Sequence, residues 1–110
     1  MKTIHTTAHT RRGFSVLGRT RSAQAATMTL AAGASSSESS ANEHGWAEQW
    51  LYVVSGRGTA RVSGRSVKLA PGTLLVIGKR EPHLITAKTR LVTVNIYVPP
   101  AYDSHGEPLR

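Results

Sequence analysis

The chain has 110 residues and a mass of 11.8 kDa, which is enough for one compact domain and too short for two. Its hydrophobic fraction of 39% allows a small core, and no apolar stretch approaches the roughly 20 residues that a membrane-spanning helix needs. The absence of cysteine excludes a disulfide scaffold, a thiolate metal site and a cysteine nucleophile.

The net charge of +8 is concentrated near the N-terminus. Residues 1–22 contain five Lys or Arg and no acid, for a net +5, whereas residues 23–110 contain nine Lys or Arg against six acids, for a net +3. Binding to phosphates needs a basic patch, preferably with stacking aromatic side chains, and this segment offers only Phe14. We interpret residues 1–11 as a flexible basic arm and do not expect nucleic-acid binding.

The N-terminal segment is also rich in Ser and Thr, a composition typical of transit peptides, but it lacks the apolar run of a secretory signal. We therefore expect a cytoplasmic protein that does not enter membranes. We expect a single barrel domain over residues 12–103, followed by a short tail over residues 104–110.

The rest of the chain predicts short strands separated by turns. Apolar and β-branched runs bounded by Gly, Pro and Ser indicate strands at Phe14–Leu17, Gln24–Leu30, Gln49–Val54, Thr59–Val62, Val67–Leu69, Thr73–Ile77, His83–Ala87 and Arg90–Val98. The Ser-rich segment 34–41 predicts a polar loop that buries nothing. Strands at this spacing favour an all-β jelly-roll barrel, a double-stranded β-helix with room for side chains and one small ligand.

The segment from Gln49 to Gly58, followed by Leu69-Ala70-Pro71-Gly72 and then by His83, resembles the cupin superfamily, and the resemblance covers about residues 24–98. The first cupin motif is His-x-His, three or four residues, Glu, six residues and Gly. Here Gln49 stands at the glutamate position before Gly56, and His44 fits the second histidine, which leaves Asn42 at the first.

The second cupin motif is Gly, five residues, Pro-x-Gly, two residues, His, three residues and Asn. Gly72 and His83 fit its spacing, whereas Gly78, Arg80 and Ala87 replace its Pro, Gly and Asn. The run YVPPAYD at 97–103 is similar to the end of small bacterial single-domain cupins. The resemblance supports the barrel and implies a site inside it.

A candidate metal site consists of His44, Gln49 and His83. If Gln49 faces inward, as its family position implies, the two imidazoles could converge on its amide oxygen. Such neutral donors suit a borderline divalent ion, Zn²⁺, Ni²⁺, Fe²⁺ or Mn²⁺. The site would bind more weakly than the three His and one Glu of the family, and a metal-free protein is the alternative. Glu43 and Glu48 are alternative ligands if the register is shifted by one residue.

Alternation along 49–54 places Leu51 and Val53 on the same face as Gln49. Together with Ile85 they are the expected apolar wall of a ligand pocket. Asn95 is a candidate ligand contact, although either face of strand 90–98 is apolar enough to be buried. The remaining histidines, His5, His9 and His105, are expected in solvent.

The opposite face of these strands predicts an interface. Trp50, Tyr52, Val94 and Ile96 would form a contiguous exposed apolar patch on a lone chain. We therefore expect a homodimer packed through one sheet. The alternative is that the segment Phe14–Leu17 folds back and covers the patch.

Catalytic motifs are few, because no supported Ser-His-Asp arrangement, phosphate loop or spaced carboxylate pair occurs. The preferred hypothesis is a small cupin-fold protein that binds a divalent metal, a small polar ligand or both inside the barrel. One alternative is a metal-dependent enzyme of the dioxygenase or isomerase type that acts on a small metabolite. The other is a metal-free structural or regulatory module whose basic arm contacts an acidic partner.

Overall fold

The computed structural model describes residues 1–9, 13–37 and 44–110. Within them the chain forms a short 3-10 helix, η1, at Thr6–His9 and eight strands. The strands are β1 (Gly13–Arg19), β2 (Gln24–Leu30), β3 (Glu48–Ser55), β4 (Gly58–Val62), β5 (Arg65–Leu69), β6 (Leu74–Ile77), β7 (His83–Ala87) and β8 (Leu91–Val98). Each of the eight predicted strands is present. No helix of the described residues is long and apolar enough to cross a membrane.

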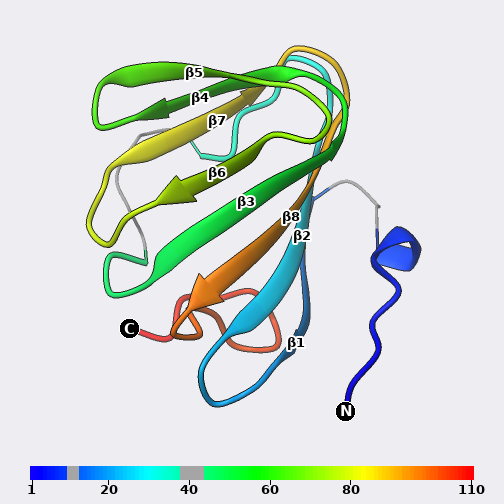
Figure 1. Ribbon diagram of the computed structural model, residues 1–110, viewed down its shortest axis with the longest axis vertical. Coiled ribbons are helices and arrows are strands. Elements are labelled where there is room, and N and C mark those ends of the chain that lie inside the picture. Colours follow the sequence, from blue (N-terminus) through cyan, green and yellow to red (C-terminus); the bar gives the residue numbers. More distant parts are fainter. Residues whose placement is uncertain (10–12, 38–43) are drawn as a thin grey trace.

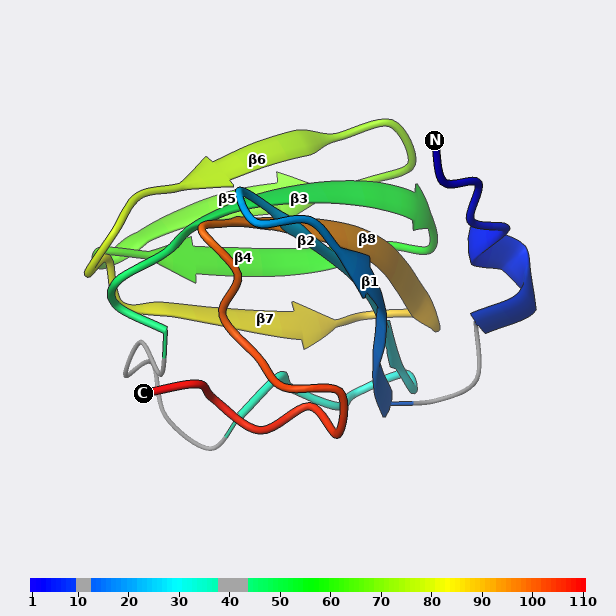
Figure 2. The same ribbon diagram turned by 90° about the horizontal axis from the view of Figure 1, so that it is seen from below.

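The strands form two antiparallel sheets that face each other (Figures 1 and 2). The larger sheet has the order β1-β2-β8-β3-β6, and the smaller has the order β5-β4-β7. Most neighbours in these sheets are distant in sequence, as β2 with β8 and β4 with β7 are. This arrangement is a jelly-roll barrel, so the predicted all-β fold is confirmed.

The core forms between the sheets because β3 alternates as its sequence predicts. Gln49, Leu51 and Val53 are at most 4% exposed, whereas Trp50 and Tyr52 are 40% and 45% exposed. The inward side chains of β3 meet those of the other strands in one aliphatic cluster, made of Leu30, Leu51, Val53, Ala60, Leu69, Ile85, Ala87 and Leu91. A second cluster, of Ala26, Ala47, Tyr97, Ala101 and Tyr102, lies apart from the first.

Residues 33–36 form backbone hydrogen bonds with β7 that their serine-rich sequence does not suggest. The Ser36 N–H donates to the Ile85 carbonyl at 2.8 Å, and the Ser36 hydroxyl accepts the Ile85 N–H at 3.1 Å. Gly33 and Ala34 bond to Ala87 in the same way, and Ala34 packs against the aliphatic cluster. Residues 35–37 are exposed, in agreement with the expectation that this polar segment buries nothing, and only Ala34 is half-buried. What the expectation lacked is the pairing with β7, whose edge supplies the backbone partners.

The C-terminal segment folds back across the end of β2. The buried Gln24 side chain donates to the Tyr102 carbonyl at 2.7 Å and accepts the N–H groups of Ala101 and Tyr102. Tyr102 bridges to Pro108, and Leu109 N–H donates to the Ala101 carbonyl. These bonds hold residues 101–109, most of the predicted tail included, against the barrel.

The N-terminal residues lie beside β1. Lys2 Nζ donates to the Arg19 carbonyl at 2.6 Å, and Ile4 lies next to Gly18. The strand β1 itself pairs with β2 at the edge of the larger sheet, and its Phe14 points inward. The alternative in which 14–17 covers the outer apolar patch is therefore wrong.

Candidate functional site

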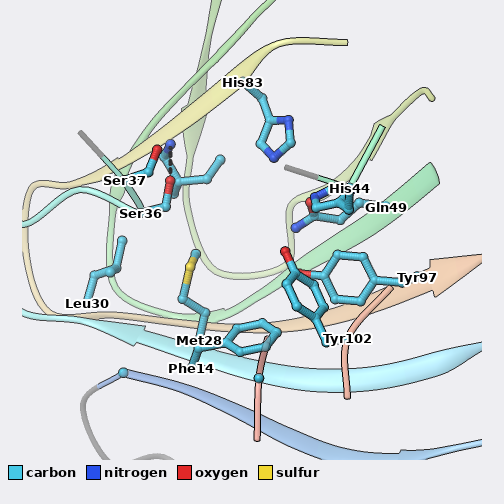
Figure 3. Close-up of a pocket in the computed structure, with 13 residues that line it drawn as sticks. Phe14, Met28, Leu30, Ser36, Ser37, His44, Gln49, His83, Tyr97 and Tyr102 are labelled. Carbon is cyan, nitrogen blue, oxygen red and sulfur yellow. Dashed lines mark hydrogen bonds between the residues drawn. The ribbon is translucent and has the colours of Figure 1, made fainter. Parts of the chain in front are cut away.

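A cavity of about 250 Å³ lies inside the barrel, between the two hydrophobic clusters (Figure 3). Four strands of the larger sheet, β7 of the smaller sheet, the segment at 36–37 and the C-terminal segment contribute to its wall. The lining side chains are Phe14, Met28, Leu30, Ser36, Ser37, His44, Gln49, His83, Ile85, Tyr97 and Tyr102, with Gly13 and Gly106. All three predicted metal ligands are therefore at one cavity.

The two histidines come from different parts of the chain but lie next to each other, with their ring planes tilted by 44°. His44 precedes β3 and is 2% exposed, and His83 is the first residue of β7 and is half-buried. Their ring centres are 5.1 Å apart. Two imidazoles bound at about 2.0–2.1 Å to one tetrahedral ion have ring centres about 5 Å apart, so this separation suits a shared ligand.

A backbone contact determines which nitrogen of His83 carries the proton. Nδ1 lies 3.0 Å from the Glu81 carbonyl oxygen, which can only accept, so Nδ1 carries the hydrogen. The lone pair is then on Nε2. A second hydrogen bond of this kind typically orients a metal-binding histidine and determines its tautomer.

The orientation of the Gln49 amide follows from a chain of hydrogen bonds on the inner face of the larger sheet. Thr93 Oγ1 donates to the Met28 carbonyl at 3.5 Å and accepts from Asn95 Nδ2 at 3.1 Å. Asn95 Oδ1 then accepts from Gln49 Nε2 at 3.0 Å. Because the chain ends at a backbone acceptor, each group has one consistent direction. Gln49 Oε1 is left buried, without a hydrogen-bond partner among the described residues.

A divalent ion fits this donor set. A buried amide oxygen without a partner costs free energy unless a cation, a donor or a water satisfies it. The described residues contain no group of three or more His, Cys, Asp or Glu, so the donors here are two imidazoles and one amide oxygen. Neutral nitrogen and oxygen donors of this type suit Zn²⁺, Ni²⁺, Fe²⁺ or Mn²⁺.

The predicted pocket residues have three different positions. Ile85 lines the cavity, whereas Leu51 and Val53 lie in the aliphatic cluster beside it. Asn95 is fully buried and faces inward. This is one of the two orientations that the sequence allowed for β8. Its amide contacts Gln49 rather than the cavity, so Asn95 is a positioning residue.

Of the two alternative carboxylate ligands, Glu48 lies within the described residues and Glu43 does not. Glu48 accepts the Trp50 Nε1 hydrogen at 3.0 Å on the outer face of β3, so a one-residue register shift is excluded for it. Glu43 and Asn42 lie outside the described residues. His5 and His105 are exposed, as expected, and the side chain of His9 also lies outside the described part.

Sequence reasoning missed the aromatic wall. Tyr97 packs edge to face against Phe14 and Tyr102, and the Phe14 and Tyr102 rings are tilted at 57° to each other; the ring centres are 4.8 to 6.3 Å apart. The His44 ring centre lies 5.0 Å from that of Tyr97. The alternation of side chains along β8 was one available signal for Tyr97, because Tyr97 lies on the same face of the strand as Asn95. Tyr102 carried no local signal, because only the return of the C-terminal segment brings it to the cavity.

The turn at 103–107 closes one side of the cavity, where Gly106 lies against Phe14. The Asp103 carboxylate accepts N–H groups of Glu107 and His105 at 3.1 and 2.8 Å, and these bonds lower the pKa of Asp103. Because the pKa of Asp103 is lower in the folded protein than in the unfolded chain, its carboxylate stabilises the fold fully at pH values above the unfolded-state pKa. This stabilisation is lost as the pH falls through the pKa of Asp103 in the folded protein.

We expect Asp103→Asn to lower the urea midpoint of unfolding at pH 7, and the difference from wild type to shrink towards about pH 3. Both proteins are compared by circular dichroism across this range. The exposed Ser104 supplies a control, since Ser104→Ala removes no charge. A difference that is the same at both pH values would show that the carboxylate charge plays no part.

Comparisons with known proteins agree with this architecture. The family model for the cupin domain matches residues 26–97, and the chain belongs to the cupin family. No curated protein matches the chain significantly.

Similar solved structures include a Bacillus halodurans protein, with a TM-score of 0.78 and 20% identity over 88% of this chain and 77% of that one. An RmlC-like cupin from Shewanella frigidimarina has a TM-score of 0.73 and 18% identity over 91% of this chain and 93% of its own. KdgF from Halomonas sp. has a TM-score of 0.70 and 20% identity over 79% and 77%. At these identities the likeness concerns the fold.

Proposed function

We propose that this cupin binds a divalent metal ion at His44, Gln49 and His83 and a small molecule beside it. The observation that carries this is the Gln49 amide, whose Oε1 is buried without a partner among the described residues at the cavity that both imidazoles line. The unit that binds is the barrel of residues 12–103, and the cytoplasm is its expected location.

Each residue has a distinct part in this proposal. His83 offers Nε2 because Glu81 occupies Nδ1, and Gln49 offers Oε1 because Asn95 occupies Nε2. When bound, the ion supplies a Lewis acid that polarises a carbonyl or hydroxyl of the small molecule. Tyr97 packs against His44 and limits the orientations of its ring.

Elemental analysis tests the proposed metal site on protein that has been exposed to neither a chelator nor a metal-affinity column. We expect close to one divalent ion per chain. Protein without bound metal, which also takes up none of the four candidate ions by titration, would contradict the proposal. Oxygen uptake or turnover with a panel of small metabolites would place the protein in the enzyme class instead.

We further propose that the protein is a homodimer joined through the outer face of the larger sheet. A shallow apolar groove crosses β3, β6 and β8, lined by Trp50, Tyr52, Leu74, Val94, Ile96 and Val98. Leu74 and Val76 are 56% and 46% exposed in the single chain. Contiguous apolar surface of this kind on a small protein usually marks an interface, and twofold pairing of identical faces is the commonest solution.

Light scattering at micromolar concentration is expected to give twice the monomer mass of 11.8 kDa. Leu74→Glu should shift the protein to the monomer, because a pairing of identical faces buries the new carboxylates from both subunits. Val67→Glu, at a similarly apolar but separate exposed site on β5, should leave the mass unchanged. A wild-type mass of a single chain would overturn the proposed dimer.

A further inference from the structure

We infer that the hydroxyl of Thr93 determines which end of the Gln49 amide faces the cavity, and that it holds the oxygen there. Thr93 is not among the described residues that line the cavity. It is therefore a positioning residue, and it acts through Asn95. The consequence for metal binding rests on the proposed function, whereas the direction of the amide does not.

The groups concerned share the inner face of the larger sheet. Thr93 and Asn95 are two residues apart on β8, so their side chains point to the same side. Met28 of β2 lies opposite Thr93, and Gln49 of β3 lies diagonally across from Asn95. Figure 3 shows the Gln49 side chain at the cavity, beside His44. Since Thr93 and Asn95 are fully buried, they must find their hydrogen-bond partners among these groups.

The side chains of Gln49, Asn95 and Thr93 form a relay that has two self-consistent arrangements, because an amide can turn over and exchange its oxygen with its NH2 group. In the structure, Gln49 Nε2 donates to Asn95 Oδ1 at 3.0 Å, and Asn95 Nδ2 donates to Thr93 Oγ1 at 3.1 Å. In the reversed arrangement, the Thr93 hydroxyl donates to Asn95 and Asn95 donates to Gln49. The NH2 group of Gln49 then faces the cavity.

The two arrangements differ in what the Thr93 hydroxyl hydrogen does. In the structure it points to the Met28 carbonyl, 3.5 Å away, and this leaves Oγ1 able to accept from Asn95. Reversal turns the hydrogen to Asn95, and the bond to Met28 is lost. The observed direction therefore has one more hydrogen bond than the reversed direction. Because that bond is long, the margin is small and depends on one hydroxyl group.

Thr93→Val keeps nearly the same shape but removes both the donor and the acceptor. If the Gln49 oxygen stayed toward the cavity, Asn95 Nδ2 would lose its acceptor in a fully buried position. If the relay reverses, Asn95 Nδ2 donates to Gln49, and the Asn95 oxygen is the group that lacks a partner. Among buried backbone groups, orphaned N–H donors are rarer than under-satisfied carbonyls. The same preference in side-chain amides favours reversal in this variant.

The direction of the amide determines the sign of the partial charge that Gln49 presents. With its oxygen forward, Gln49 offers a lone pair to a cation at the cavity that His83 also lines. With its NH2 group forward, it presents partially positive hydrogens, which repel a cation. Residue 93 thus determines whether this position supports a metal ion, although it lies behind Asn95.

The direct test is NMR of the metal-free full-length chain, which measures scalar coupling across the hydrogen bond. In the wild type and in Thr93→Ser, which keeps the hydroxyl, we expect coupling from Gln49 Nε2 to Asn95 Cγ. In Thr93→Val the coupling should run from Asn95 Nδ2 to Gln49 Cδ. The wild-type direction in Thr93→Val would overturn the inference.

The second test is calorimetric titration with Zn²⁺. Thr93→Val should weaken binding about tenfold, the size that loss of an outer partner of a metal ligand typically has. Thr93→Ser should restore the affinity to within about twofold of wild type. In a Gln49→Ala chain no amide is left to position, so Thr93→Val should cause no additional loss. An equal loss with and without Gln49 would show a merely structural role and contradict the inference.

The chain offers a matched control in Thr29 of β2. Thr29 is also a buried threonine of the larger sheet, and its Oγ1 has no partner among the described residues. Thr29→Val makes the same change outside the relay, and should alter neither the Zn²⁺ affinity nor the amide direction. A loss of affinity equal to that of Thr93→Val would count against the inference. Circular dichroism checks folding, and Thr93→Ala replaces Thr93→Val if the latter does not fold.

The outcomes separate this inference from the proposed metal site. A wild-type protein that takes up no Zn²⁺ would refute the metal site, and the couplings of the metal-free chains would still decide the direction of the amide. Stoichiometric Zn²⁺ binding, with affinity and amide direction both unchanged in Thr93→Val, would refute the inference and leave the metal site standing.

Discussion

Replacement of His83 by alanine is expected to lower the affinity of the protein for Zn²⁺ by at least about 100-fold. Loss of an outer partner of a metal ligand typically costs 10- to 100-fold in affinity, and His83 is proposed as a direct ligand. Its ring is also pre-oriented by the 3.0 Å bond to the Glu81 carbonyl, and alanine supplies no donor in its place. Calorimetric titration of the chelator-treated proteins measures the change.

Two further variants test the rest of the set. Gln49→Ala removes the oriented amide oxygen, and His44→Ala removes the second imidazole, which lies 5.1 Å from the first. Each should also weaken Zn²⁺, with Gln49→Ala giving the smaller change because an amide oxygen is a weaker donor than imidazole. The exposed His105 provides the control, and His105→Ala should bind as wild type does. Unchanged affinity in all three site variants would end the proposed metal site.

The largest expected effect on stability comes from Gly56→Ala. Gly56 has a φ of +87°, and a Cβ there would overlap the Arg90 carbonyl oxygen and lie 2.8 Å from Leu91 Cα. Both atoms belong to backbone at the start of β8, which cannot turn aside as a flexible side chain can. We expect a loss of about 4 kcal/mol, which is exceptionally large for one substitution, because overpacking against rigid backbone adds to the strain of the left-handed φ.

Gly72→Ala separates the steric overlap from the backbone strain. Gly72 has a φ of +89°, nearly that of Gly56, but no atom lies within 4 Å of its ideal Cβ position. This variant should therefore lose only about 1–2 kcal/mol, the cost of placing alanine in the left-handed region. Urea denaturation of both proteins gives the two values. Equal losses would mean that the approach of Arg90 to Gly56 has no energetic consequence.

Much of this architecture was predictable because strands leave a local record in sequence. The alternation of Gln49, Leu51 and Val53 with Trp50 and Tyr52 predicted which face of β3 is buried, since side chains alternate along any strand. Turn residues marked the strand ends. The motif spacing from Gln49 to Gly56 and from Gly72 to His83 resembles that of cupins, and this resemblance indicated the candidate ligands.

Sequence reasoning did not reveal the contacts between distant segments. The pairing of 33–36 with β7 was missed, because a serine-rich stretch has no periodicity and its partners lie about fifty residues away. The hydrogen bond of Asn95 to Gln49 was also not predicted. The alternation of side chains along a strand does not show whether an inward-facing amide contacts a ligand or another side chain. Here Asn95 contacts Gln49 on the neighbouring strand.

The sequence by itself determined the eight strands and the buried face of β3, because these depend on local periodicity, and its resemblance to the cupin motifs indicated the three candidate ligands. Only the tertiary structure decided what surrounds the ligands. Phe14, Met28 and Tyr102 reach the cavity through β1–β2 pairing and through the return of the C-terminal segment to Gln24. Such long-range contacts depend on the packing of the whole chain, and no local pattern records them.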